Sequence, residues 1–222
     1  MSPQNSSSAD LSIRPPLQER SRQAWARVLD AGVAIIEEGG LEAFTIAAVC
    51  ERAQVAPRAI YARADTKDAL FLAVYEHGLA RVEADQAVLT DTERWAGSPA
   101  EAVVRGAVEE TARIFARHDR FLKAIVLISG AHPEVQRRGG ASTRRLGDQF
   151  TSLVLAHRDH ITHDDPESAV RTCFNTTFAA LVVRVAYGPG FTAPETDYAT
   201  FTAQLGDVAV RYLLGGEPPA AG

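Results

Sequence analysis

The sequence predicts an all-α protein in which a small N-terminal helical domain precedes a larger helical bundle. Apolar residues recur at intervals of three and four along most of the chain, and the breaks between these stretches fall at Pro, Gly and Asp residues. The sequence has no alternating strand pattern and no internal repeat. A length of 222 residues with 46% apolar content suffices for a small domain joined to a larger one.

Composition excludes several classes of protein. The chain has no run of about 18 apolar residues and no basic-then-apolar signal segment, so we expect no membrane partner and a cytoplasmic location. Cys50 and Cys173 lie far apart inside apolar helical patterns, which favours buried free thiols. The net charge is −5, but residues 1–67 hold 8 basic and 8 acidic residues, so the acidic excess lies in the remainder. A nucleic-acid partner is therefore compatible with the N-terminal part.

The first elements are a polar arm and an amphipathic helix. Residues 1–18 are rich in Ser and Pro and predict a disordered arm, in which Arg14 either follows a DNA groove or is simply solvated. From Glu19 to Glu38 apolar residues recur at helical spacing, and Gly39-Gly40 ends this helix. We expect the helix to buttress the short helices of residues 45–70.

The stretch from Thr45 to Leu70 predicts two short helices joined by a tight turn, followed by the start of a third helix. Thr45 is the expected N-cap of the first, and residues 54–56 form the turn. Pro57 suits the first position of the second helix, because its fixed φ is already helical and its missing N–H would have no partner there. Thr66 is expected to cap the third helix. This pattern is a helix-turn-helix.

The second short helix has the polarity of a DNA recognition helix. Ile60 is expected to point to the core, whereas Arg58, Tyr61 and Arg63 point outward. Such a helix enters the major groove by its N-terminal end, where side chains reach base edges. Arg58 is therefore the expected base contact.

Residues 21–75 resemble the N-terminal domain of the TetR family of bacterial transcriptional regulators. The resemblance rests on the long first helix ending at Gly39-Gly40, on Phe44-Thr45, on the apolar register and on the spacing from Tyr61 to Lys67. The apolar register consists of Ile46, Val49, Ala53 and Val55. The resemblance implies an operator in double-stranded DNA and places Tyr61 and Lys67 at phosphate contacts. With the residues around them, the predicted DNA-binding set is Arg20, Arg22, Thr45, Gln54, Pro57, Arg58, Tyr61, Arg63 and Lys67.

The chain departs from the family pattern at four positions. Gln54 replaces the usual turn glycine, Ala56 a serine cap, Ala59 a hydroxyl residue that often touches phosphate, and Ala64 an aromatic residue. A turn residue with positive φ is strained unless it is glycine, and an alanine cap forfeits about 1 kcal/mol. An alternative hypothesis is therefore a small-molecule-binding dimer of the same fold with weak or no specific operator binding.

The rest of the chain predicts a bundle. A helix from Thr66 to about Leu89 leaves the helix-turn-helix, and a loop is expected from Thr90 to Pro99. Further helices are expected at residues 99–117, 119–129, 133–159, 165–187 and 195–214. We assign residues 19–67 to the DNA-binding domain, 68–214 to an effector-binding and dimerisation domain, and 215–222 to a frayed tail.

Aromatic and polar residues on the apolar helix faces indicate a ligand pocket in the bundle. An apolar cavity with a few polar groups is the usual design of a ligand site, although each of these residues could instead fill the core or face water. The predicted lining is Phe115, His118, Phe121, Ile125, Phe150, Leu153, Arg171, Phe174, Asn175 and Phe178.

The last two helices carry apolar stripes with several small residues. In the resembled family this pair of helices forms a two-fold four-helix dimer interface, which doubles the number of base pairs read. A wholly intramolecular contact is the alternative. The predicted interface residues are Ala180, Leu181, Arg184, Phe201, Leu205, Val208 and Tyr212.

The sequence gives little support for catalysis or metal binding. The sequence has no nucleophile elbow, phosphate-binding glycine loop, zincin helix or paired Cys-x-x-Cys motif, so we expect neither an enzyme nor a cofactor. His157, His160 and His163 are spaced by three, but they run into a helix end where solvated polar residues are expected, so we expect no metal there. The sequence thus predicts a homodimeric repressor released from its operator by a small, largely apolar effector.

Overall fold

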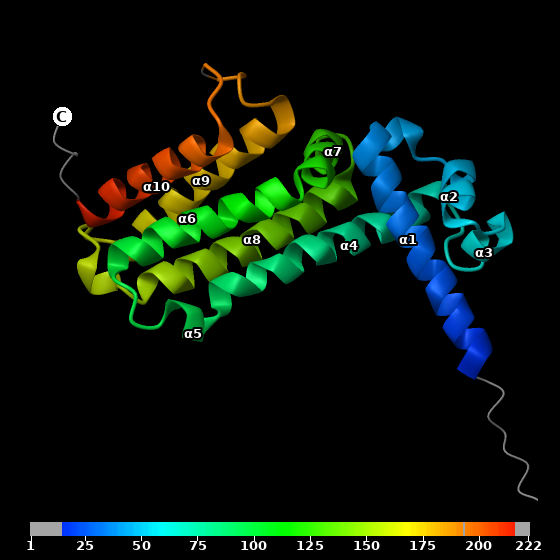
Figure 1. The fold of residues 1–222 in the computed structure, drawn as a ribbon, viewed down its shortest axis with the longest axis horizontal. Helices are drawn as coiled ribbons and strands as arrows, with labels where there is room; N and C mark the ends of the chain where they lie inside the picture. The colour runs from blue at the N-terminus through cyan, green and yellow to red at the C-terminus, as the bar shows by residue number, and fades with distance from the viewer. Residues whose placement is uncertain (1–14, 193, 216–222) are drawn as a thin grey trace, which may run out of the picture.

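The structure, a computed structural model, describes residues 15–192 and 194–215, and within these residues it contains helices and no strands. The predicted all-α class is confirmed. The N-terminal unit consists of α1 (Pro15–Ala43), α2 (Ile46–Ala53) and α3 (Pro57–Tyr61). The second unit consists of α4 (Lys67–Asp85), η1 (Gln86–Thr90), α5 (Thr92–Trp95), α6 (Ala100–Arg117), α7 (Asp119–Ser129), α8 (Pro133–Leu155), η2 (Arg158–His160), α9 (Pro166–Tyr187) and α10 (Tyr198–Leu214). Figure 1 shows the two units side by side, with α4 running from one into the other.

The first helix is longer than its predicted range. α1 begins at Pro15, inside the residues assigned to the arm, and continues to Ala43 across a kink at Gly40, where φ is 65°. Glycine accepts this left-handed backbone because it has no Cβ, so the regular helix stops where the sequence predicts. The rest of the predicted arm, including Arg14, and the predicted tail from residue 216 onward lie outside the described residues.

Side-chain caps start α2 and α4 as predicted. Thr45 Oγ1 accepts a hydrogen bond from the Ala48 N–H at 3.1 Å, and Thr66 Oγ1 accepts one from the Ala69 N–H at 3.0 Å. Each bond satisfies an amide that has no partner in the first helical turn. These two caps fix where the turn and the recognition helix lie relative to α4.

Three other helix ends differ from the prediction by a few residues. α4 stops at Asp85 and continues as η1, and α8 stops at Leu155 before the short η2. α10 begins at Tyr198, because Asp197 caps it by accepting a hydrogen bond from the Thr200 N–H at 2.9 Å. The predicted loop between residues 90 and 99 includes the one-turn helix α5.

The core of the small domain continues into the bundle through α4. Phe44 and Ile60 are fully buried beneath the helix-turn-helix, and Val74 and Tyr75 of α4 extend the same cluster to Phe121 of α7. A second cluster lies farther along the bundle between α6, α8, α9 and α10. Cys50 and Cys173 are buried free thiols, as predicted.

Acidic side chains along α4 bind basic side chains of the elements that surround it. These pairs are Asp68 with His132, Glu76 with Arg138, Glu83 with Arg145 and Asp85 with His118. In addition, His77 Nε2 of α4 lies 2.7 Å from Asp30 Oδ1 of α1. α4 is therefore tied to α1, to the junction between α6 and α7, and to the start and middle of α8.

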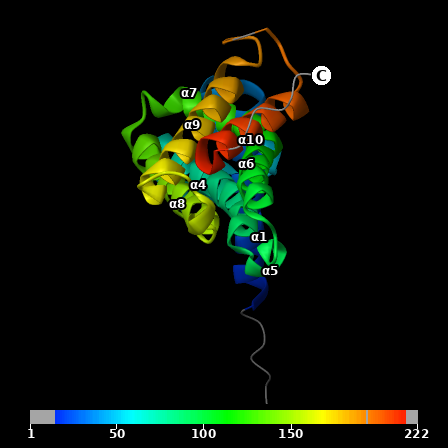
Figure 2. The same cartoon turned by 90° about the vertical axis from the view of Figure 1, so that its left-hand side faces the viewer.

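α9 and α10 form the outer layer of the bundle. α10 packs against α6, where Arg105 Nη1 donates to Asp207 Oδ1 at 2.6 Å, and α9 packs against α7, α8 and α10. Figure 2 shows α9 and α10 at the side of the bundle away from α4 and α5. In the part of the chain that the structure describes, no helix is long and apolar enough to cross a membrane.

Candidate DNA-binding surface and ligand pocket

The helix-turn-helix presents α3 at the outer edge of the molecule (Figure 1). Ile60 is fully buried and anchors α3 against the small domain, whereas Arg58 is exposed and Tyr61 is 50% exposed. Lys67 opens α4 beside this helix and is exposed too. A guanidinium, a phenol and an ammonium are thus exposed at α3 and the start of α4, and each can donate hydrogen bonds to base edges or phosphates.

Near the N-terminus of α1, two further arginines predicted to contact DNA are exposed. Arg22 Nη2 donates to Glu19 Oε2 at 2.8 Å, and Arg20 is exposed in the same turn. An exposed ion pair between neighbouring turns is worth only about 0.3–0.5 kcal/mol, so the pairing leaves Arg22 free to turn toward a phosphate.

Arg63 has a role in the fold that the sequence did not reveal. Its guanidinium lies 5.4 Å from the centre of the Trp25 ring, and its Nη2 donates to Ser21 Oγ at 3.1 Å. Both partners belong to α1, some 40 residues earlier in the chain. Arg63 therefore ties the end of the recognition helix to α1, and its contact with DNA stays a prediction.

The turn keeps its geometry without the usual glycine. Gln54 has φ 54° and ψ 50°, and its backbone N–H is directed to the Cys50 and Glu51 carbonyl oxygens, which closes α2. An L residue in this left-handed region is strained by about 1–2 kcal/mol. Ala56, at the cap of α3, offers no side-chain hydrogen bond, and Ala64 is buried. The fold thus tolerates the departures from the family pattern.

The missing cap gives a stability prediction. Ala56→Ser should stabilise the protein by about 1 kcal/mol, because the hydroxyl can accept a bond from a free amide in the first turn of α3. This raises the thermal unfolding midpoint by about 2–4 °C for a protein of this size. The control is Ala59→Ser, an exposed position inside α3, where serine has no capping role. An equal rise in both variants, measured by circular dichroism, would count against the capping explanation.

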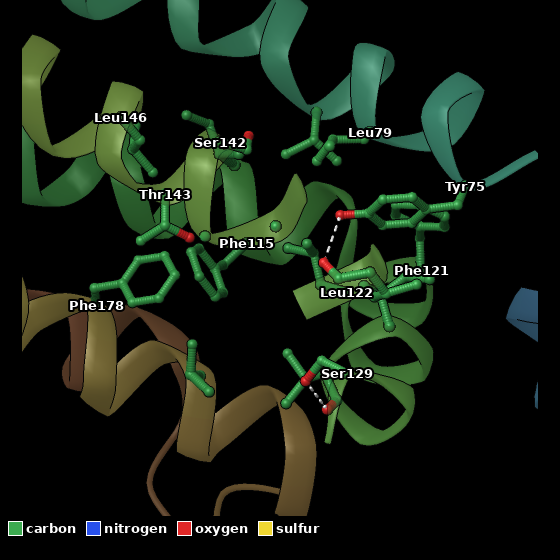
Figure 3. Close-up of a pocket in the computed structure, with 18 of the residues that line it drawn as sticks. Tyr75, Leu79, Phe115, Phe121, Leu122, Ser129, Ser142, Thr143, Leu146 and Phe178 are labelled. Atoms are coloured by element: carbon green, nitrogen blue, oxygen red, sulfur yellow. Dashed lines mark hydrogen bonds between the residues drawn. The ribbon is translucent and has the colours of Figure 1, made fainter. Parts of the chain in front are cut away.

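The bundle contains a cavity of about 270 Å³ between α4, α6, α7, α8 and α9 (Figure 3). None of the described residues that line it carries a charge. Its polar groups are hydroxyls and amides, among them Ser129 and Thr143. The lining residues are Tyr75, Leu79, Val82, Gln86, Ile114, Phe115, Phe121, Leu122, Ile125, Val126, Ser129, Val135, Gln136, Gly139, Gly140, Ser142, Thr143, Leu146, Phe178 and Val182.

Aromatic rings define two sides of this cavity. Phe115 and Phe178 meet edge to face with ring centres 5.4 Å apart, and Tyr75 stacks on Phe121 at 6.4 Å. The Tyr75 hydroxyl donates to the Val135 carbonyl at 3.4 Å. Burial raises the pKa of Tyr75 to about 12, so the phenol stays neutral near pH 7. The cavity therefore suits an apolar group with few hydrogen-bonding atoms.

Four residues of the predicted ligand set lie at the cavity: Phe115, Phe121, Ile125 and Phe178. The other six lie elsewhere. Phe150 and Phe174 pack together in the second core cluster with ring centres 5.5 Å apart, and Leu153 lies in a separate surface groove near Trp95. His118 Nε2 lies 2.8 Å from Asp85 Oδ2.

Arg171 and Asn175 do not line the cavity. Both are exposed on α9, and Arg171 binds Asp148 and Glu167. The inner face of α9 is formed by Val170, Cys173, Phe174, Thr177 and Leu181. Arg171 and Asn175 each follow one of these residues, so the turn of the helix directs them to solvent. The sequence pattern also did not predict that α4 residues and the glycines of α8 line the cavity.

Comparison with family models decides the classification. A model described as "Bacterial regulatory proteins, tetR family" matches residues 28–74, and one described as "Tetracyclin repressor-like, C-terminal domain" matches residues 99–213. The chain belongs to the TetR family. It is therefore a DNA-binding transcriptional regulator and not an enzyme, as the sequence resemblance implies.

Solved structures agree on the fold of this TetR-family regulator. A transcriptional regulator from Rhodococcus sp. Rha1 is 16% identical with a TM-score of 0.64, over 87% of this chain and 98% of that one. A tetR-family regulatory protein from Rhodococcus RHA1 is 17% identical with a TM-score of 0.63, over 86% and 96%. FadR from Bacillus subtilis, in complex with stearoyl-CoA, is 12% identical with a TM-score of 0.63, over 87% and 100%. The search of curated proteins gave no match.

The predicted dimer residues of this TetR-family regulator range from exposed to fully buried in the protomer. Val208 is 58% exposed and Tyr212 39% exposed, while Ala180, Phe201 and Leu205 are half-buried. Leu181 is fully buried inside the protomer, so it cannot lie on an outer surface. Arg184 packs over Phe201 at 4.5 Å and donates to the Thr196 carbonyl at 2.6 Å. Within this predicted set, the two exposed side chains, Val208 and Tyr212, both lie on α10.

The three histidines that follow α8 do not form a metal site in the described residues. No group of three or more His, Cys, Asp or Glu side chains converges there. His163 instead bonds the Tyr212 carbonyl and packs against that tyrosine ring at 4.5 Å. It joins the end of α10 to the loop before α9.

Proposed function

We propose that this TetR-family regulator is a homodimeric repressor that leaves its operator when a small, largely apolar molecule occupies the cavity between α4, α6, α7, α8 and α9. One observation carries the proposal: the same helix, α4, presents Lys67 beside the recognition helix and lines the cavity with Tyr75, Leu79 and Val82. A ligand that displaces α4 acts on the DNA-binding surface directly.

DNA recognition needs two protomers in this proposal. α3 has only five residues, so a single copy reads few base pairs. Two recognition helices related by a two-fold axis bind successive major grooves about 34 Å apart. The outer faces of α9 and α10, with Val208 and Tyr212 exposed, supply apolar surface for the partner copy.

The coupling between the sites follows from differential binding. A ligand shifts the protein from the DNA-competent state only as far as it prefers the other state. A small tilt of α4 moves the small domain and changes the spacing of the two recognition helices, which spoils simultaneous docking in both grooves. Coupling of about 1–3 kcal/mol is typical and corresponds to about a 5- to 150-fold loss of operator affinity.

The character of the cavity supports an apolar effector. Its described lining holds no charged side chain and several aromatic rings, and sites of this kind bind ligands mainly through apolar contact. A related fold, FadR from B. subtilis, binds stearoyl-CoA, a molecule with a long apolar chain.

Operator binding itself is tested by a gel-shift experiment with the DNA upstream of the protein's own gene. The proposal expects binding that survives an excess of random competitor DNA. Equal affinity for upstream and random DNA would instead favour the alternative of a ligand-binding dimer with weak or no specific operator binding, which the departures at Gln54, Ala56, Ala59 and Ala64 motivate.

The cavity gives a further prediction. Phe178→Ala should weaken an effector by about 10- to 100-fold, the value of one buried aromatic side chain, while the operator affinity of the ligand-free protein stays nearly unchanged. Phe150→Ala is the control, because Phe150 is buried in the second core cluster and does not line the cavity. Both variants lose stability, so ligand binding is measured by calorimetry below their unfolding midpoints. Equal losses of ligand affinity would contradict the assignment of the cavity.

A further inference from the structure

Two consecutive glycines of α8, Gly139 and Gly140, are among the residues that line the cavity. Gly139 and Gly140 lie inside a 23-residue helix, where each glycine costs about 1 kcal/mol relative to alanine, so their presence calls for a local reason. Both line the cavity and both are half-buried. A Cβ on Gly140 would lie 3.4 Å from Arg144 Nη1.

This distance places the Arg144 guanidinium beside Gly140, which lines the cavity, and Arg144 is exposed, so the guanidinium lies at the solvent-facing edge of the cavity, here called the rim. Side chains on a helix lean toward its N-terminus, so Arg144 covers the position one turn earlier, which is Gly140. Arg144 does not itself line the cavity, whereas Gly140 and the exposed Gln136 do. The absence of a side chain on Gly140 leaves space for the guanidinium beside the opening.

Arg144 also differs from the other arginines of its helix. Arg137 binds Glu134, Arg138 binds Glu134 and Glu76, and Arg145 binds Glu83. Asp148, one turn after Arg144, binds Arg171 of α9. Among the residues that the structure describes, no carboxylate pairs with Arg144, so an unpaired guanidinium stands next to an uncharged cavity.

We propose that the effector is an amphipathic anion, with an aliphatic part that fills the cavity and a carboxylate that Arg144 binds at the rim. This inference rests on the proposed function and names the ligand class of the same site. A carboxylate inside the apolar cavity would lose its hydration without a charged partner, which is strongly unfavourable. At the rim it stays partly hydrated, and the planar guanidinium can donate two parallel hydrogen bonds to its two oxygens.

The volume limits the size of the aliphatic part. A cavity of about 270 Å³ lies just below the usual range of about 300–1,000 Å³ for ligand pockets, which favours one unbranched chain of moderate length over a fused ring system. Decanoate is therefore the anionic probe, and decan-1-ol is the neutral probe of the same length.

The test compares both probes by titration calorimetry with the full chain. The wild-type protein should bind decanoate more tightly than decan-1-ol. Arg144→Gln should weaken decanoate about 5- to 20-fold, between the value of an exposed ion pair and that of a charged hydrogen bond, and leave decan-1-ol unchanged. Arg144→Lys should restore part of the loss. The control is Arg81→Gln, which removes the same charge from an exposed site on α4 and should change neither affinity.

The outcomes separate this inference from the proposed function. The anionic ligand class is overturned by any of three results. The wild-type protein binds the two probes equally tightly, Arg144→Gln loses affinity for both probes equally, or neither probe binds. If decan-1-ol binds and releases operator DNA without any preference for decanoate, the proposed sensor function stands and only the role of Arg144 is wrong. If decanoate binds with the expected dependence on Arg144 but never changes operator affinity, the ligand class stands and the proposed control of DNA binding is wrong.

Discussion

Val208→Asp should convert the protein from a dimer to a monomer. Val208 is 58% exposed in the protomer, so an aspartate there leaves the fold of the single chain intact. In a two-fold interface that includes this face, the same position is buried and occurs once on each protomer. An unpaired charge buried in an apolar contact costs several kcal/mol, which is enough to abolish a dimer at micromolar concentration.

Light scattering coupled to gel filtration measures this directly, and operator affinity should fall together with dimerisation. The control is Ala80→Asp on α4, because Ala80 is exposed and α4 lies at the side of the bundle away from α9 and α10 (Figure 2). A wild-type protein that is monomeric at micromolar concentration, or a Val208→Asp variant that stays dimeric, would contradict the proposed interface.

Arg58→Ala should relax the choice of DNA sequence, whereas Lys67→Ala should weaken binding to all DNA. Arg58 is exposed at the N-terminal end of α3, from which a guanidinium reaches guanine in the major groove, and such a contact is worth about 1–3 kcal/mol. Lys67 opens α4, and the loss of one phosphate contact lowers the slope of binding against salt concentration by about one.

Fluorescence anisotropy with the upstream fragment and with random DNA at several salt concentrations separates the two effects. The assignment of Arg58 fails if its alanine variant loses the same affinity for both DNAs, because a base contact discriminates and a phosphate contact does not.

The helix-turn-helix could be predicted from sequence because its signals are local. The Thr45 and Thr66 caps, the proline at the start of α3 and the Gly40 kink act over three or four residues, and each has one structural consequence. Arg63 shows the limit of such signals. Its partners Ser21 and Trp25 are some 40 residues away, so no local pattern links them.

The ligand cavity is harder to predict, because it depends on how helices rotate against one another. Periodicity identifies the apolar face of a helix, but it does not say which neighbours that face meets. Phe115 and Phe178 line the cavity while Phe150 and Phe174, on equally apolar faces, fill a separate core cluster. The part that α4 plays in lining the cavity was not predicted for the same reason. Tyr75 is the last residue of the stretch that resembles a DNA-binding domain, and yet its side chain lines the cavity of the bundle.

Reciprocal titration tests the central claim most directly, which is that a ligand in the cavity and operator DNA compete through α4. Operator affinity is measured with and without saturating decanoate or decan-1-ol, and the affinity of the same probe is measured with and without operator DNA. We predict that each ligand weakens the other by one common factor of about 5- to 150-fold, as linkage requires. A probe that binds the protein with the same affinity in the presence and absence of operator DNA would contradict the account.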